Sequence, residues 1–498
     1  MAITRMLGKL GLLLLVLVGG LGPAGGEPQT ERADWAAAGW LGDLERAKAR
    51  ARAQGKPVFI YFDARWCSWC HRYAAETLSQ PRVQRVLRAE TVPVVLDWDA
   101  RRDLVHRYGG RGLPFNVLLA PDGRILRAFT GILPPAELIA LVRDIPAPEE
   151  AAPAAALRPD GLDAAAYDRF RAAYLDHLER LYAPDVGTLA GRFETGVGLK
   201  RSQPLAWMWL ADQPGWRERV PRARQAAVDR LLDPLDAGFF YYVDPHRPDA
   251  HRETAKLLEH NAWMVAWLAG AAERRPRLAA WSGWLFLRHV LWDEAEGGFW
   301  RAQVADSDYY AHPPARRLPL PAPPVDRAKL ADANAQAALA LLQAADRLEQ
   351  PTMAAYGRRA LDFVLAELLH DGHLYHSRQG GQRSVADLPA DLFWVLWAGD
   401  AVQARAPEAE RGERLAVVAG RAADWLRQRM AEGNEGDPPR TEVIALAARV
   451  CSRRERYPAL PEGCRDWALR RLALRPETRP DWLIPGLRAW EGRLKAGT

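Results

Sequence analysis

Two patterns of hydrophobic and polar residues divide the chain. As far as residue 145, short apolar runs alternate with amphipathic segments. The apolar runs predict strands over Pro57–Phe62, Thr91–Leu96, Phe115–Leu119 and Ile125–Phe129. The amphipathic segments predict helices over Asp34–Gln54, Cys70–Leu78, Pro81–Glu90, Arg101–Tyr108 and Pro134–Asp144. This order of elements predicts a small α/β domain over residues 33–145.

The second pattern is helical almost throughout. A Pro- and Ala-rich segment, residues 146–159, is typical of a semi-rigid linker. An all-helical domain is then predicted over residues 160–498, with amphipathic helices such as Ala164–Leu181, Arg222–Leu232, Thr254–Ala272, Leu330–Arg347, Met353–Leu369 and Arg414–Met430. Three similar motifs of an acid, a glycine and aromatic residues lie between helices, at Asp236–Tyr241, Glu296–Arg301 and Asp371–His376. They predict an array of helical hairpins with short turns on one rim.

The first residues have the form of an export signal. Arg5 and Lys9 precede the apolar run Leu10–Val18, and the small residues Gly22–Ala24 follow. This pattern predicts a signal peptide over residues 1–24 and a periplasmic or secreted protein. The alternative is an uncleaved N-terminal segment, through which alone the protein would contact a membrane.

The charges argue against a nucleic-acid partner. Lys and Arg total 68 against 62 Asp and Glu, which leaves a net charge of +6. The basic residues are scattered singly among acids and form no long run of like charge. A mildly basic, solvated surface accounts for this balance.

Four cysteines carry the candidate chemistry. Cys67 and Cys70 follow a predicted strand and begin a helix, where free backbone N–H groups favour a thiolate. We expect Cys67 to be the exposed nucleophile and Cys70 the buried resolving thiol. A zinc site would need four ligands, and a c-type haem site, which Cys67-x-x-Cys70-His71 matches, needs no preceding strand. A redox pair is the favoured interpretation, with no metal and no cofactor.

The other two cysteines lie near the C-terminus. Cys451 ends an Ala-rich helix, and Cys464 begins the next one after Pro458, Pro461 and Gly463. We expect a structural disulfide between them, because export makes oxidation available and the two helix ends can approach each other. The alternative is two unrelated buried thiols.

The motif Phe62–His71, followed by Pro114–Gly123, resembles the thioredoxin superfamily. More narrowly, Cys-x-Trp-Cys-His resembles the spermatogenesis-associated thioredoxin-like family, which joins a thioredoxin-like domain to a helical toroid. Looser likenesses in the helical part are Gly238–Tyr242, Lys256–Ala262, Asp326–Asn334 and Asp391.

The resemblance implies a fold and a set of roles. The fold is an α/β thioredoxin-like domain followed by an all-α toroid, an (α/α) barrel of the six-hairpin glycosidase and sugar-epimerase kind. Pro114 is expected to be cis and to lie beside the two sulfurs, and Trp66, Trp69 and His71 are expected to tune the pair. Tyr61 stands where many thioredoxins bury an Asp, and His260 where the family has an acid.

Candidate residues for a cavity in the toroid are Glu259, His260, Asn261 and Asp391. The alternative is that they are satisfied polar groups on inner helices. His373 and His376 are too few for a metal site by themselves.

Two functions remain in view. The first is an exported thiol-disulfide oxidoreductase that acts on protein thiols or disulfides, with the toroid binding a partner or ligand. The second is a carbohydrate-active or carbohydrate-binding toroid with an accessory thioredoxin domain. A non-catalytic scaffold is a third interpretation.

Overall fold

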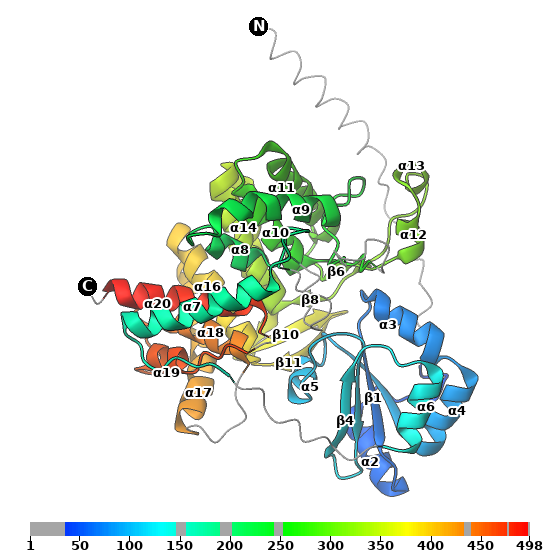
Figure 1. Ribbon diagram of the computed structural model, residues 1–498. Coiled ribbons are helices and arrows are strands. Elements are labelled where there is room, and N and C mark those ends of the chain that lie inside the picture. Colours follow the sequence, from blue (N-terminus) through cyan, green and yellow to red (C-terminus); the bar gives the residue numbers. More distant parts are fainter. Residues whose placement is uncertain are drawn as a thin grey trace. The chain divides into compact units, whose positions relative to one another are not determined.

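The computed structural model describes residues 35–145, 156–189, 202–243, 252–432, 440–475 and 478–496 (Figure 1). The predicted signal peptide and most of the predicted linker lie outside these ranges. Within them, no helix combines the length and the apolar character that crossing a membrane would require.

The N-terminal part is an α/β domain built on a four-stranded sheet in the order β2-β1-β3-β4. The strands are β1 (Val58–Asp63), β2 (Val92–Asp97), β3 (Phe115–Leu119) and β4 (Ile125–Thr130). β1 runs parallel to β2 and antiparallel to β3, and every residue of β1 is buried. The central strand therefore reads as a continuous apolar run, as expected for a strand that is covered on both faces.

Helices flank this sheet at the positions that the sequence pattern predicts. They are α2 (Leu44–Gln54), α3 (Ser68–Tyr73), its π-helical continuation η1 (Ala74–Leu78), α4 (Pro81–Glu90), α5 (Arg102–Arg107) and α6 (Pro135–Arg143). The expectation of a helix from Asp34 onward is wrong for its first half. α2 begins only at Leu44, because Asp43 is extended and its side chain accepts a hydrogen bond from the N–H of Arg46.

The helical part closes into a ring. The inner helices are α8 (Pro204–Leu210), α10 (Leu258–Ala269), α14 (Ala331–Leu348), α16 (Pro389–Arg405), α18 (Thr441–Cys451) and α20 (Pro480–Ala496). Each of these contacts the next, and α20 contacts α8. The outer helices are α7 (Ala164–Leu181), α9 (Val220–Leu231), α11 (Arg274–Phe286), α15 (Pro351–Phe363), α17 (Ala409–Ala431) and α19 (Cys464–Arg470). Because outer and inner helices alternate along the chain, the ring is an (α/α) toroid of helical hairpins.

Short elements join the hairpins. The helical ones are η3 (Arg217–Arg219), η4 (Leu287–Leu291), α12 (Ser307–Ala311), α13 (Pro314–Arg317) and η5 (Val364–Leu368). The strands are β5 (Lys256–Leu257), β6 (Ala302–Gln303), β7 (Val325–Asp326), β8 (Lys329–Leu330), β9 (Leu369–His370), β10 (His373–Gln379) and β11 (Gln382–Ala386). The sequence analysis missed the hairpin β10–β11, whose mixed polar and apolar residues give no strong period.

The first two repeated motifs form rim turns that are held by residues at or just before the start of the next inner helix. In the first turn, the amide of Asn261 accepts a hydrogen bond from the N–H of Phe239 (2.6 Å) and donates to its carbonyl (3.0 Å). The ammonium of Lys256 binds Asp233 (2.9 Å) and the carbonyl of Ala237 (2.7 Å). Asn261, a sequence candidate for the cavity, is therefore a buried structural residue.

The second turn repeats these contacts. Asn334 binds the backbone of Phe299 through an N–H (2.7 Å) and a carbonyl (3.1 Å), and Lys329 binds Asp293 (2.6 Å). The segments that begin at Lys256 and Lys329 are thus equivalent, with lysine and asparagine five residues apart in both. Their spacing reflects one structural unit used twice.

A disulfide joins Cys451, the last residue of α18, to Cys464, the first of α19, with their Cα atoms 5.9 Å apart. Both side chains are buried. The bond links an inner helix of the ring to the outer helix that follows it.

Alanine substitutions at Gly298 and Gly297 test the packing of the second rim turn. At Gly298, a φ of +74° and a Cβ position 2.6 Å from Phe363 both oppose a side chain, whereas the neighbouring Gly297 has a similar φ (+77°) and open space. Gly297→Ala is expected to cost about 1–2 kcal/mol of unfolding free energy through backbone strain alone. Gly298→Ala is expected to cost about 1–3 kcal/mol more through overpacking. Urea unfolding measures both, and equal losses would contradict the packing.

Candidate functional site

The cysteine pair begins the helix that follows β1. Cys67 precedes α3, and its sulfur accepts a hydrogen bond from the N–H of Cys70 (3.1 Å). The two cysteines form a disulfide with their Cα atoms 5.3 Å apart. Cys67 is only 1% exposed, so the expectation of an exposed Cys67 is wrong for this structure. The helical part covers the pair, because Tyr241 packs edge-on against Trp66 and Glu253 binds Ser68.

Pro114 lies in the loop before β3, and the Leu113–Pro114 peptide bond is cis. Gly112 and Leu113 line the same cavity as Cys67. The structure therefore brings the cysteine pair and this loop to one place, although about forty residues separate them in the sequence.

The residues expected to tune the pair are held by specific contacts. The indole N–H of Trp66 donates to Asp99 (2.8 Å), and the guanidinium of Arg301 lies 5.3 Å from the Trp66 ring. A ring nitrogen of His71 lies 2.9 Å from the carbonyl of Arg65, within its own loop. Trp69 lines the cavity beside Cys67. Trp66 and Trp69 thus both contact the toroid, Trp66 through Arg301 and Trp69 through Tyr242 and Glu253.

Tyr61 lies next to Cys70, the second cysteine of the pair. Its hydroxyl lies 3.1 Å from a carboxylate oxygen of Asp63 and 3.2 Å from the carbonyl of Cys70. A buried phenol therefore stands where the resemblance leads one to look for a carboxyl.

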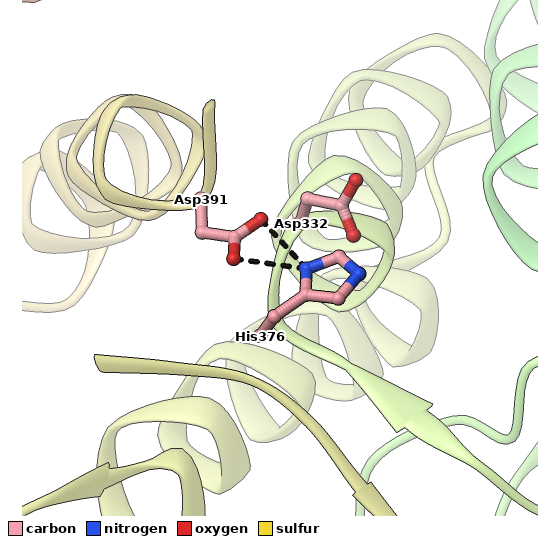
Figure 2. Close-up of side chains that lie close together, drawn as sticks. All are labelled: Asp332, His376 and Asp391. Carbon is pink, nitrogen blue, oxygen red and sulfur yellow. Dashed lines mark hydrogen bonds and ion pairs between the residues drawn. The ribbon is translucent and has the colours of Figure 1, made fainter. Parts of the chain in front are cut away.

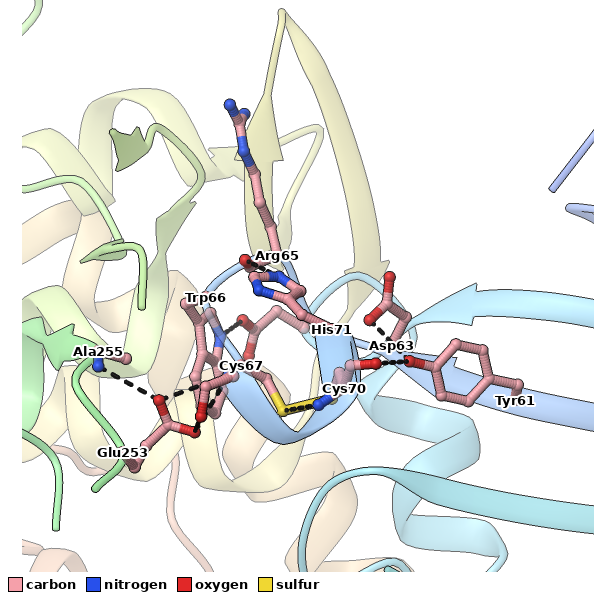
Figure 3. The surroundings of a disulfide bond; sticks show 11 residues. Tyr61, Asp63, Arg65, Trp66, Cys67, Cys70, His71, Glu253 and Ala255 are labelled. Carbon is pink, nitrogen blue, oxygen red and sulfur yellow. Dashed lines mark hydrogen bonds between the residues drawn. A yellow bond between two sulfur atoms is a disulfide. The ribbon is translucent and has the colours of Figure 1, made fainter. Parts of the chain in front are cut away.

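The sequence analysis missed Glu253, which lies just before β5. Its carboxylate accepts hydrogen bonds from the N–H of Ser68 (3.2 Å), the Ser68 hydroxyl (2.8 Å) and the N–H of Ala255 (3.2 Å) (Figure 3). Burial raises the pKa of Glu253 to about 7 against these hydrogen bonds, which favour the charged form. No motif surrounds Glu253, and 185 positions separate it from Ser68, so no sequence signal could have paired them.

A second buried contact joins the α/β domain to the toroid. Arg301 binds Asp99 at 3.0 Å through one nitrogen and Glu259 at 2.6 Å through another. Burial disfavours the charged form of Asp99, but Arg301 and Arg102 outweigh it and hold its pKa below the usual range. Glu259, a sequence candidate for the cavity, thus lies on the cavity wall and also anchors Arg301.

A cavity of about 460 Å³ lies between the cysteine pair and the inner helices. From the α/β domain its wall includes Trp66, Cys67 and Trp69, and from the toroid Glu253, Glu259, His260, Trp263, Asp332 and Trp394. His260 also meets Tyr241 edge-on, with ring centroids 5.7 Å apart. The cysteine pair and the toroid interior therefore share one chamber.

Asp332 on this wall forms a cluster with two buried residues, His376 and Asp391 (Figure 2). Nδ1 of His376 lies 2.9 and 3.1 Å from the two carboxylate oxygens of Asp391, and one potential ligand atom from each of Asp332, His376 and Asp391 lies within 4.8 Å of the others. Burial opposes the imidazolium, but Asp391 outweighs it, so the pKa of His376 is raised. Burial also raises the pKa of Asp332, which lines the chamber.

The groups of this cluster can bind protons, and one atom from each of the three residues could also hold a metal ion. The hydrogen bond to Asp391 occupies Nδ1 of His376. The other ring nitrogen, Nε2, has no hydrogen-bond partner among the described residues, so Nε2 and the carboxylate of Asp332 are the atoms left to bind a proton or a ligand. Asp391 was a sequence candidate, whereas Asp332 was not. The sequence did contain a signal that could have identified Asp332. It lies three residues after a lysine in the repeated segment, the same position that Glu259 occupies in the first copy.

Comparisons with known proteins find relatives of the N-terminal part of the chain. Residues 39–121 match the family model described as thioredoxin-like. These residues form a thioredoxin-like domain. Human spermatogenesis-associated protein 20 is 30% identical over 100 residues, which are 18% of this chain and 12% of the human protein. Thiol:disulfide interchange protein DsbD 2 of Pseudomonas aeruginosa is 33% identical over 89 residues, 17% of this chain and 15% of that protein.

The chain thus spans a small part of the curated relatives it matches. Among solved structures, cellobiose 2-epimerase from Spirochaeta thermophila is similar over 67% of this chain and 98% of its own, at 15% identity and a TM-score of 0.49. The toroid itself follows from the closed ring of inner helices.

Arg301 tests the contact between the thioredoxin-like domain and the toroid. Arg301→Met is expected to cost about 3–5 kcal/mol, because it leaves the Asp99 carboxylate buried without its cation. The pKa of Asp99 is lower in the folded state than in the unfolded state. The difference in unfolding free energy between the wild type and Arg301→Met is therefore full at neutral pH and disappears as the pH falls through the folded-state pKa. Urea unfolding at several pH values measures this.

The control is Arg169→Met, which removes an exposed ion pair with Asp160 and should leave the unfolding midpoint unchanged. Equal effects of the two substitutions would show that the buried contact has no special weight.

Proposed function

We propose that this protein is a thiol-disulfide oxidoreductase whose Cys67–Cys70 pair works at the mouth of the toroid chamber. The supporting observation is the pair at the start of α3, beside the loop of Pro114, in a thioredoxin-like domain. The printed name of the Pseudomonas relative, a thiol:disulfide interchange protein, agrees with this chemistry.

The reaction is an exchange of two electrons between two pairs of sulfurs. In the reducing direction, the thiolate of Cys67 attacks one sulfur of a substrate disulfide, and the other sulfur leaves as a thiolate that takes up a proton. Cys70 then loses its proton and attacks the sulfur of Cys67. The products are the Cys67–Cys70 disulfide and the second thiol of the substrate. The oxidising direction is the same sequence reversed.

The partners proposed are protein thiols or disulfides. Gly112 and Leu113 line the chamber beside Cys67, so an extended segment of a partner could pair with this backbone edge while it presents its sulfur. Export to a periplasmic or extracellular compartment is part of the proposal. It is supported by the N-terminal pattern and by the second disulfide, Cys451–Cys464, which requires an oxidising environment.

Replacing each redox cysteine tests the exchange. Cys67→Ser is expected to abolish turnover of a peptide disulfide with dithiothreitol as reductant, because serine cannot form the mixed disulfide. Cys70→Ser is expected to accumulate that mixed disulfide, visible as added peptide mass on intact protein. The matched control is the double variant Cys451→Ser/Cys464→Ser, which should keep its turnover. Turnover that survives in Cys67→Ser would refute the proposal.

A second candidate function is binding of a carbohydrate or other small polar ligand in the toroid. The observation that favours it is Asp332 on the chamber wall, with His376 and Asp391 behind it and Trp263 and Trp394 alongside. Aromatic faces and paired polar groups are the surfaces on which sugar rings bind.

Calorimetry with neutral disaccharides tests this second candidate. Binding to the wild-type chain is expected, with at least about tenfold weaker affinity in Asp332→Asn, since each tenfold corresponds to the loss of one good hydrogen bond. Asp371→Asn, at an exposed turn, is the control that should bind normally. Absence of binding by the wild type would remove the candidate.

A further inference from the structure

Glu253 places a carboxylate from the toroid on the first turn of the helix that carries the cysteine pair. It binds both the backbone N–H and the hydroxyl of Ser68, the residue next to Cys67. The N–H of Trp69 also contributes a hydrogen bond to it. Glu253 is 2% exposed, so the contact is fully enclosed.

Among the described residues, the groups that form hydrogen bonds with this carboxylate are neutral. They are backbone N–H groups of Ser68, Trp69 and Ala255 and the hydroxyl of Ser68. Hydrogen bonds of this kind hold a negative charge without cancelling it. A thiolate on Cys67 would draw on the same helical turn, because its sulfur already accepts the N–H of Cys70.

We propose that Glu253 restrains Cys67: the toroid supplies a negative charge that competes with the Cys67 thiolate for the first turn of α3. Cys67 then becomes a good nucleophile only when Glu253 holds a proton or moves away. Glu253 is a positioning residue under this proposal, since it acts through the helix turn and not on the substrate. The physiological meaning rests on the proposed function, but the ionisation of Cys67 is measurable without it.

The pH dependence follows from the coupled ionisation of two acids, the Glu253 carboxyl and the Cys67 thiol. Because burial raises the pKa of Glu253 to about 7, this carboxyl is neutral below that pH in the oxidised protein and charged above it. When the pair is reduced, ionisation of either group opposes ionisation of the other, so the thiol titrates over a broad range. Below pH 6 the carboxyl is neutral and its restraint on Cys67 is absent.

Other titratable or charged groups face this site. Tyr242 lies against Glu253, and burial raises the pKa of its phenol well above the range of interest. Asp99 and Arg301 form an ion pair behind Trp66, and His71 binds the carbonyl of Arg65. Glu259, His260, Arg102, Arg111, Arg440 and Glu442 line other parts of the chamber. The charge of Glu253 adds to the raised pKa of Tyr242, but burial is the larger cause, so this phenol stays neutral in Glu253→Gln over the range tested.

The experiment measures thiolate formation on Cys67 in the full-length reduced protein. The absorbance of the thiolate near 240 nm and the rate of alkylation by iodoacetamide are followed across the pH range, with Cys67→Ser as the blank. Glu253→Gln keeps a hydrogen-bond acceptor and removes the charge. Glu137→Gln, at an exposed position on α6, is the matched control.

We expect the apparent pKa of Cys67 to fall by about one unit in Glu253→Gln, as for removal of a nearby like charge. At pH 7, where about half of Glu253 is protonated, its alkylation should be up to about twofold faster than in the wild type; the difference should grow to several-fold near pH 8, and the rates should converge at pH 5.5. Against glutathione, the pair should shift toward the reduced form. An unchanged or raised pKa of Cys67 would overturn the proposal.

The wild type alone provides a second test, should Glu253→Gln fail to fold. Its alkylation rate should rise with pH over more than one ordinary titration step, and a single-step curve would overturn the proposal. Failure of the peptide-disulfide assay together with a shifted Cys67 pKa would refute the proposed function and leave this inference intact. Normal turnover of the peptide disulfide with an unshifted Cys67 pKa would support the proposed function and refute this inference.

Discussion

The arrangement of the site depends on two buried polar contacts between the thioredoxin-like domain and the toroid. Arg301 spans from Asp99 to Glu259, and Glu253 binds Ser68. Buried charges and carboxyls of this kind are costly unless all their partners are in place, so they specify one docking of the two parts. This docking buries Cys67 and turns the cysteine pair toward the chamber.

The toroid can supply these residues because its inner helices begin in a repeated way. Lys256 and Lys329 bind the acids of the rim turns, and Asn261 and Asn334 bind the turn backbones. The turns therefore hold the starts of α10 and α14 in equivalent positions. Glu259 and Asp332, which follow each lysine by three residues, both line the chamber as a result.

This arrangement differs from a redox site that is open to solvent. Under the proposed function, a partner would bring its sulfur to a pair enclosed by toroid residues, and groups from both parts of the chain surround Cys67. The cluster of Asp332, His376 and Asp391 gives the toroid side of the chamber a separate set of proton-binding groups. Thiol chemistry and ligand binding are thus candidates for one compartment.

The sequence by itself determined the local features. Apolar runs and amphipathic periods placed most strands and helices, since these depend on neighbours a few residues away. The Cys67–Cys70 motif and its resemblance located the cysteine pair and the loop of Pro114. The prediction of a helix from Asp34 is wrong for its first half, because the helix start is set by a single side-chain contact of Asp43. The β10–β11 hairpin was missed because its polar and apolar residues do not alternate strongly.

Only the tertiary structure decided which distant groups meet. The burial of Cys67, the pairing of Ser68 with Glu253 and the union of Asp332 with His376 and Asp391 join residues from separate elements. The role of Asn261 changed from cavity candidate to turn anchor for the same reason. Hydrophobic periodicity reports only whether a side chain faces inward, whereas hydrogen bonds depend on positions accurate to a few tenths of an ångström, which the packing of the whole ring sets.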